Sequence, residues 1–339
     1  MTFTAESRKA PQPRVILLLA VLALVTVAYG IWSPGQIVED GRNDLGYNGI
    51  WLQHGWLGDD AWFVRYDRDL NRFRDVNAVR ALAKTLSEHN IRDIFPHLCP
   101  CASDGRIAQV DHAQAELFLG ELSGFRVLPW VGGVLNDHVF LESAHWREAF
   151  TRSIVGLLVR HPGFAGVHLN IEPMPSGNED FLRLLEEINA ALPPDKLLSV
   201  AAFPPPTIWH WYPNVHWDEE YFAAVSQRVD QVAVMMYDTG IRLPKLYQSL
   251  MASWTRKVLD WPANTQVLLG VPVYDDEGVG YHFPRVENLR GALLGIHAGL
   301  NRYDELPSNY QGVAIYCEWE MDDDEWDYLS RHFNKPTTD

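Results

Sequence analysis

The feature that most constrains the fold of this chain is a strand-like segment that recurs eight times at a nearly regular interval. Each segment is short, apolar and rich in β-branched residues. The segments begin at Gly49, Ile91, Phe125, Ala165, Leu197, Gln231, Gln266 and Gly312. Successive starts lie about 38 residues apart on average, which is the length of one strand followed by one helix.

The stretches between these segments have the apolar spacing of helices, as in Val76, Val79, Leu82 and Leu86. Eight strand–helix units predict an α/β fold in which residues 48–335 form a single (β/α)8 TIM barrel. A doubly wound open sheet is the alternative. It is disfavoured because no G-x-G-x-x-G follows the first strand and the chain contains no P-loop.

An apolar segment precedes the barrel. Residues 15–32 form an uncharged run of 18 residues, and Arg8, Lys9 and Arg14 lie on its N-terminal side. As a helix this run would be about 27 Å long, close to the thickness of the hydrocarbon core of a bilayer. The run therefore predicts one transmembrane signal-anchor helix at residues 15–32.

The basic residues predict the orientation of this helix. Under the positive-inside rule, residues 1–14 are cytoplasmic, residues 33–47 are a linker, and the barrel lies outside the cytoplasm, in the periplasm or the extracellular space. A cleaved secretory signal is the alternative, because Ala28-Tyr29-Gly30 is an acceptable small-x-small site. Both interpretations give an extracytoplasmic barrel, and the first makes the membrane a partner.

Charge excludes one class of partner. The chain has 28 Lys+Arg against 44 Asp+Glu, a formal net charge of −16 at pH 7. Such a chain repels phosphate backbones, so nucleic acid is not an expected ligand. The sequence contains 13 Trp, which either pack in the core or form a surface that stacks on flat ligands.

Acidic and aromatic side chains gather at the carboxyl ends of the strand-like segments, where a barrel of this kind carries its chemistry. The aromatic residues predicted to contact a ligand there are Trp56, Trp130, Trp209, Trp211, Tyr274, Tyr316 and Trp319. Carboxyls that transfer protons and rings that stack on pyranoses suit a sugar cleft. Packing within the barrel or on its rim is the alternative for Trp56, Trp209 and Trp211.

The fourth segment carries the sharpest signal. Because strand side chains alternate, His168, Asn170 and Glu172 share the face that points into the barrel and its mouth. A carboxyl ringed by aromatic residues is desolvated and its pKa is raised, as a proton donor to a glycosidic oxygen requires. A hydrogen-bonded polar triad in an ordinary barrel core is the alternative.

Four motifs resemble those of glycoside hydrolase family 18, the chitinase-like barrels. AGVHLNIE at 165–172 resembles the family's DG-x-D-x-D-x-E, and WVGG at 130–133 is similar to its S-x-G-G. MMYD at 235–238 matches M-x-Y-D, and LLGVPVY at 268–274 is similar to its G-x-P-x-Y segment. The motifs fall in order on the third, fourth, sixth and seventh strands, and the resemblance covers residues 48–330.

The resemblance implies retaining, substrate-assisted hydrolysis of a β-linked N-acetylhexosamine-containing glycan, without a metal or cofactor. Glu172 would be the general acid and base, Tyr237 would hydrogen-bond the acetamido oxygen, and Asp238 would bind sugar hydroxyls. Asn170 replaces the family's last Asp, in an Asn-x-Glu pair that resembles endo-β-N-acetylglucosaminidases of family 85. His168 replaces the middle Asp and would line the site.

Further departures leave alternatives open. Ala165 replaces the first Asp of the motif, and either Tyr316 or Trp319 replaces the Trp that floors the family's sugar site. One alternative is a two-carboxylate retaining glycosidase with a late Glu nucleophile, for which Glu277, Glu318 and Glu320 are available. The other is an inactive, lectin-like glycan-binding barrel.

Overall fold

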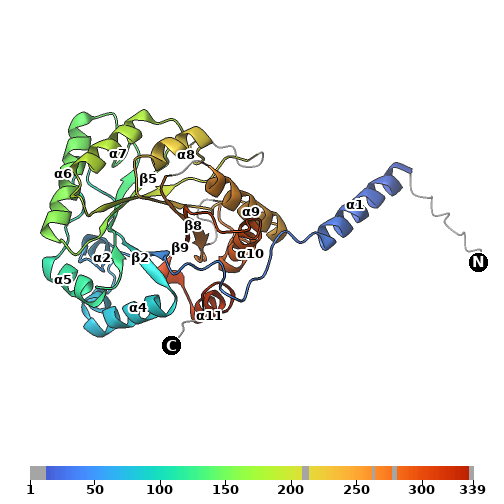
Figure 1. The fold of residues 1–339 in the computed structure, drawn as a ribbon, viewed down its shortest axis with the longest axis horizontal. Helices are drawn as coiled ribbons and strands as arrows, with labels where there is room; N and C mark the ends of the chain where they lie inside the picture. Colours follow the sequence, from blue (N-terminus) through green and yellow to red (C-terminus); the bar gives the residue numbers. More distant parts are fainter. Residues whose placement is uncertain (1–12, 208–213, 262–263, 277–280, 336–339) are drawn as a thin grey trace, which may run out of the picture.

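The structure, a computed structural model, describes residues 13–207, 214–261, 264–276 and 281–335. A closed ring of strands is surrounded by helices, and one long N-terminal helix projects from the side of this ring (Figure 1).

All strand pairs in the barrel are parallel, and the sheet order is β3-β2-β1-β9-β8-β7-β6-β5-β4. The strands are β1 Asn48–Leu52, β2 Ile91–Pro96, β3 Arg126–Val127, β4 Trp130–Val134, β5 Gly166–Glu172, β6 Leu197–Ala202, β7 Gln231–Val234, β8 Gln266–Pro272 and β9 Tyr310–Tyr316. The predicted α/β barrel is confirmed, with one correction to its third strand.

That third strand is divided in two at Leu128 and Pro129, and it closes the barrel. Its first half, β3, pairs with β2, and its second half, β4, pairs with β5, so one continuous segment holds both ends of the sheet. Across the gap, Leu128 N–H donates to the Ile94 carbonyl at 2.9 Å, and His168 N–H donates to the Pro129 carbonyl at 3.0 Å.

Helices cover the outside of the barrel. They are α2 Ala61–Arg65, α3 Asn71–Arg74, α4 Val76–Glu88, α5 His112–Glu121, α6 Ala144–Arg160, α7 Glu179–Ala191, α8 Glu219–Ser226, α9 Pro244–Asp260, α10 Leu289–Leu300, a 3-10 turn η1 Glu318–Glu320 and α11 Asp323–His332. Side-chain hydrogen bonds from N-cap residues fix where several of these helices begin. In α11, for example, Asp322 and Glu325 form a reciprocal capping box. The predicted apolar faces pack inward, as Val79, Leu82 and Leu86 of α4 do.

The N-terminal helix α1 spans Pro13–Ile31 and has no buried residue. By length and composition it is apolar enough to cross a membrane. The segment after it, predicted as a linker, packs against the barrel. Gln36 N–H donates to the Leu294 carbonyl of α10 at 2.9 Å, and the fully buried Asp44 accepts from Asn48 at 2.9 Å. The folded unit therefore includes part of residues 33–47.

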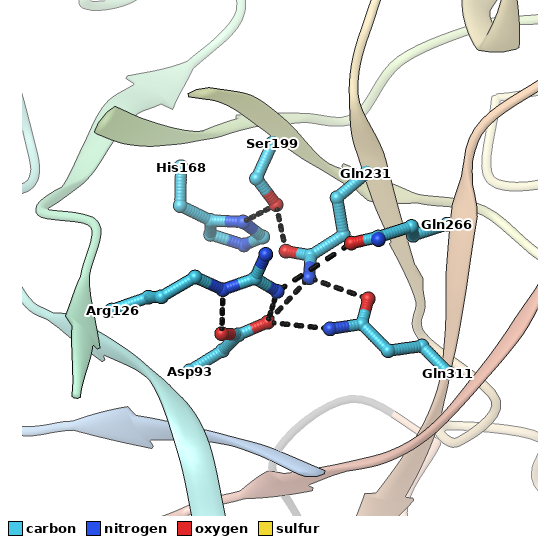
Figure 2. Close-up of polar contacts among 7 residues, drawn as sticks. All are labelled: Asp93, Arg126, His168, Ser199, Gln231, Gln266 and Gln311. Atoms are coloured by element: carbon cyan, nitrogen blue, oxygen red, sulfur yellow. Dashed lines mark hydrogen bonds and ion pairs between the residues drawn. The ribbon is translucent and has the colours of Figure 1, made fainter. Parts of the chain in front are cut away.

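A polar network occupies the interior of the barrel near the starts of the strands (Figure 2). The fully buried Asp93 accepts two hydrogen bonds of 2.5 Å from the Arg126 guanidinium. The amide groups of Gln231 and Gln311 donate to its Oδ2 at 2.6 and 2.9 Å. The buried carboxylate is thus paired and surrounded by donors, as a charge in a barrel interior must be.

The network continues upward to the mouth of the barrel. Ser199 Oγ donates to Gln231 Oε1 at 2.7 Å and lies 2.8 Å from His168 Nδ1, and the Trp51 indole N–H donates to His168 Nε2 at 3.1 Å. Because an indole only donates, Nε2 must be the bare nitrogen and Nδ1 must carry the proton. Burial lowers the pKa of His168 to about 3, which keeps the ring neutral. His168 therefore fixes the Trp51 ring.

Removing the cation from this network tests its contribution to stability. We expect Arg126→Ala to lower the free energy of unfolding by about 3–5 kcal/mol, because the Asp93 carboxylate would stay buried without its partner. Arg80→Ala is the matched control. Arg80 makes a similar two-bond pair with Glu121 on the surface, and its loss should cost less than about 1 kcal/mol. Equal losses in urea denaturation of the two variants would contradict the prediction.

Candidate active site

A cavity of about 1190 Å³ opens at the carboxyl ends of the strands. Among its lining residues are Trp51, Trp130, Asn170, Glu172, Tyr237, Asp238 and Tyr316, which come from β1, β4, β5, the segment after β7, and β9. Sequence analysis predicted all of these except Trp51. The barrel therefore brings the main predicted residues to one cavity, because its strands all end on the same face.

Asn170 and Glu172 lie side by side at the end of β5. Asn170 Nδ2 donates to Glu172 Oε1 at 2.6 Å. The Asn170 Oδ1 atom is buried and has no hydrogen-bond partner among the described residues, although its residue lines the cavity. A buried acceptor without a donor is rare in folded proteins.

Gly132 of the W-V-G-G motif sets the position of this pair. Gly132 pairs with Asn170 in the β4–β5 ladder and has a φ of 137°, which favours glycine. A Cβ at Gly132 would lie 1.9 Å from the Asn170 carbonyl oxygen. A larger residue would therefore push β4 and β5 apart and move the side chains that they carry.

Glu172 as a whole residue is solvent-exposed at the end of β5, where it lines the cavity, while protein atoms pack around its carboxyl. Burial raises its pKa above the ordinary value of 4.5, the hydrogen bond from Asn170 opposes this, and the negative charge of Asp238 raises it further. No basic side chain among the described residues contributes to the shift. These surroundings favour a carboxyl that keeps its proton, as a general acid does.

Two tyrosines form an aromatic wall beside Glu172. The rings of Tyr237 and Tyr316 stack with centroids 5.5 Å apart and an interplanar angle of 19°, and Trp51 meets Tyr316 edge-on at 5.8 Å. Burial raises the pKa of both tyrosines above 10, so their hydroxyls stay protonated and can donate. Of the two residues considered for the floor of the site, Tyr316 lines the cavity, whereas Trp319 packs edge-on against Tyr316 at 5.8 Å.

Asp238 is held by residues from the next loop. The Tyr274 hydroxyl donates to Asp238 Oδ1, and His282 Nδ1 lies 3.6 Å from the same oxygen. The fully buried Glu287 accepts from the backbone N–H groups of Thr239 and Gly240, at 2.9 and 3.2 Å. Glu287 thus holds the turn that follows Asp238. Sequence analysis missed His282 and Glu287, because no motif marks the loop that brings them there.

Other predicted residues do not reach the cavity. Trp56 is 1% exposed and packs against Phe73 and Phe118, because the turn at Gly55 directs it into the core. His168 is fully buried and acts on the site through Trp51. Tyr274 is 8% exposed and reaches the site through Asp238. The predicted ligand-stacking residues Trp209 and Trp211 lie outside the described residues.

The late glutamates considered as nucleophiles take other positions. Glu277 lies outside the described residues. Glu318 is buried, and its carboxyl pairs with Arg72 at 2.8 Å. Glu320 is exposed. Neither Glu318 nor Glu320 is among the described residues that line the cavity.

One group of described residues has a spacing that could hold a metal ion. It consists of His112 and Glu116 on α5 and His161 at the end of α6. None of the three lines the cavity. This group therefore adds nothing to the chemistry at Glu172.

Glu287 should make the stability of the protein depend on pH. Burial raises its pKa from 4.5 to about 7, so the folded state holds this proton more tightly than the unfolded state does. The resulting stabilisation is complete below pH 4.5 and is lost as pH rises towards 7, by about 3 kcal/mol. Glu287→Gln should remove this part of the pH dependence in urea unfolding between pH 4.5 and 7.5. A wild-type and variant difference that stays constant with pH would contradict the assignment.

Several solved structures share this fold. The spore cortex-lytic enzyme SleL of Bacillus cereus is 13% identical, with a TM-score of 0.57 and coverage of 85% of this chain and 74% of that chain. A chitinase of Chromobacterium violaceum is 15% identical, with a TM-score of 0.54 and coverage of 84% and 98%. A fungal endo-β-N-acetylglucosaminidase of glycosyl hydrolase family 18 is 16% identical, with a TM-score of 0.55 and coverage of 85% and 96%. At these identities the likeness shows the fold alone.

A comparison of sequences gives the family. No curated protein matches the chain significantly. The family model described as "Glycosyl hydrolases family 18" matches residues 115–331, which is more than half of the chain. This range includes β4, β5, the segment after β7 and β8, where the four motifs lie. The chain therefore belongs to glycosyl hydrolase family 18 and is a glycosidase.

Proposed function

We propose that this glycosidase cleaves a β-linked N-acetylhexosamine-containing glycan by retaining, substrate-assisted catalysis, with Glu172 as the general acid and base. The observation that carries the proposal is the free Oδ1 atom of Asn170, beside the proton donor Glu172 in the same cavity. It offers an acceptor where the N–H of a sugar's 2-acetamido group would need one.

Each step has a side chain suited to it. Glu172 gives its proton to the glycosidic oxygen as the bond to the anomeric carbon breaks, and the substrate's acetamido oxygen attacks that carbon to form an oxazolinium ion. Asn170 accepts the acetamide N–H, and the Tyr237 hydroxyl donates to the acetamido oxygen. Water then attacks the same carbon, and Glu172 takes the proton from this water. Asp238 binds sugar hydroxyls, and Tyr316 stacks on the sugar ring.

The two alternatives have less support. A two-carboxylate mechanism needs a second carboxyl about 5–5.5 Å from the acid in the same cavity. Glu318 is turned to Arg72 instead. An inactive relative that only binds glycans would be expected to have its pocket filled. Here Asn170, Glu172 and Tyr237 all line open space.

The N-terminal helix supports an anchored, extracytoplasmic enzyme. We propose that α1 remains in the membrane with residues 1–14 in the cytoplasm and the barrel outside. Its apolar composition and its lack of buried residues support this arrangement. The enzyme would then bind its glycan at the membrane surface rather than in bulk solution.

Replacing the proton donor is the central test. Glu172→Gln should lower the hydrolysis of N-acetylated chito-oligosaccharides by about 10²–10⁴-fold, because the amide has no proton to give. Binding of the same oligosaccharides, measured by calorimetry, should persist. Glu179→Gln, an exposed change on α7, is the matched control and should be active. Full activity of Glu172→Gln would refute the assignment.

Participation of the acetamido group has its own test. Asn170→Ala should lower kcat by roughly 10²-fold, by removing a polar partner of the reacting group. N-deacetylated oligosaccharides should be resistant to the wild-type enzyme. Cleavage of acetylated and deacetylated substrates at equal rates would exclude substrate assistance and favour a protein nucleophile.

The negative charge of Asp238 should show in the pH profile. Because Asp238 raises the pKa of Glu172 and the reaction needs protonated Glu172, Asp238→Asn should move the alkaline limb of the kcat/KM profile to lower pH. The position of the limb is decisive, since a change in rate alone could come from lost sugar contacts. A limb that stays in place or moves to higher pH would contradict the prediction.

A further inference from the structure

The cavity extends well beyond the sugar-binding residues, and a group of aliphatic side chains lines it there. On the side of the segment after β7 and of α9, the lining includes the aliphatic residues Ile241, Leu243, Leu246 and Leu250, together with Arg242, Ser249, Ser253 and Trp254. Aliphatic side chains cannot pair with sugar hydroxyls, and they lack the flat faces on which sugar rings stack. The surface formed by these aliphatic side chains therefore suits a hydrocarbon chain better than it suits a further sugar unit.

The aliphatic part opens beside the end of α1. Leu243 and Leu246 are 47% and 41% exposed, and Lys245 lies between them in the sequence. Lys245 Nζ donates to the carbonyls of Tyr29 and Gly30 at 2.9 and 2.8 Å, and its ammonium lies 5.4 Å from the centre of the Tyr29 ring. The wall of the cavity is thus tied to the last turn of α1.

This attachment relates the cavity to the membrane. The last carbonyls of a helix lack partners within it, and Lys245 satisfies two of those of α1. Tyr29 and Trp32 lie at the same end, as aromatic residues do at the surface of a bilayer. Figure 1 shows α1 leaving the barrel beside α9 and α10. If α1 is the anchor, the aliphatic end of the cavity faces the lipid surface.

Charge limits which lipid fits. The reactive part of the cavity carries the acidic Glu172 and Asp238, and Arg242 is the single Lys or Arg among the described lining residues. The Arg242 guanidinium lies 4.4 Å from the centre of the Phe283 ring. A phosphate or diphosphate between sugar and chain would lie near the negative charge of Asp238 and would find little positive charge among these lining residues. A neutral link is therefore favoured.

From these observations we infer that the substrate is a neutral glycolipid, in which an N-acetylhexosamine-containing head group is β-linked to a hydrocarbon-chain alcohol held in the membrane. This inference rests on the proposed function. The sugar would lie against Tyr237 and Tyr316, and the chain would lie along Leu243, Leu246 and Leu250. On cleavage, Glu172 protonates the oxygen of the lipid alcohol as it leaves. Water then attacks the anomeric carbon and gives the released sugar its hydroxyl group.

The test uses the full chain in phosphatidylcholine vesicles and two probes, the dodecyl and methyl β-glycosides of N,N′-diacetylchitobiose. We expect kcat/KM for the dodecyl glycoside to exceed that for the methyl glycoside by at least about tenfold. In the double variant Leu243→Asn/Leu246→Asn this ratio should fall several-fold. In Val159→Asn, an exposed change on α6, it should stay at the wild-type value.

The comparison between variants decides the outcome, because partition of the dodecyl probe into vesicles raises the ratio equally for all of them. A ratio that the double variant leaves unchanged would overturn the inference. If neither glycoside is cleaved, the proposed function fails, and binding of the two probes to Glu172→Gln decides the inference alone. Equal affinities would overturn it. A probe with a phosphate between sugar and chain that binds more tightly than the dodecyl glycoside would overturn the neutral link.

Discussion

The architecture depends on the close approach of two strands, β4 and β5, at Gly132. β4 pairs with β5 at one end of the sheet, and β3 pairs with β2 at the other end. Because β4 follows β3 directly in the chain, the two ends of the sheet are held together. A Cβ at Gly132 would lie within 1.9 Å of the Asn170 carbonyl. The same contact therefore sets the spacing of β4 and β5 and the position from which Asn170 and Glu172 project. Stability and catalytic geometry share one constraint, so a change here would damage both.

Alternate residues of β5 connect the interior of the barrel to its mouth. His168 lies in the hydrogen-bond network that ends at the paired Asp93, and Asn170 and Glu172 lie two and four residues further along. The network has a fixed donor direction, because the Trp51 indole can only donate. The Trp51 ring, which lines the cavity, is therefore positioned by residues of the barrel interior that do not line the cavity. A histidine in place of the family's middle Asp serves this purpose without adding a charge.

Sequence patterns predicted the parts of the fold that follow from periodicity. The strand–helix repeat predicted the barrel, and strand alternation together with the shared strand ends predicted that Asn170, Glu172 and Tyr237 meet. Sequence patterns did not predict the positions of side chains that are set by loop conformation. The turn at Gly55 ends the alternation and directs Trp56 into the core, and the loop after β8 brings His282 and Glu287 behind Asp238. The break of the third strand and the packing of residues 36–44 also depend on tertiary contacts that no local pattern encodes.

Two carboxyls in one cavity acquire different roles from their surroundings. Asp238 accepts a hydrogen bond from Tyr274 and lies near His282, and both contacts favour its ionised form against the burial that raises its pKa. No basic side chain contributes to the raised pKa of Glu172, whereas the negative charge of Asp238 does. Contacts that favour the ionised form of Asp238 thus also favour the protonated form of Glu172. Glu287 stabilises this arrangement from behind, because it accepts hydrogen bonds from the backbone N–H groups of the turn after Asp238. The environment of Glu172 is therefore set by side chains that follow β7 and β8, which explains why β5 alone could not reveal it.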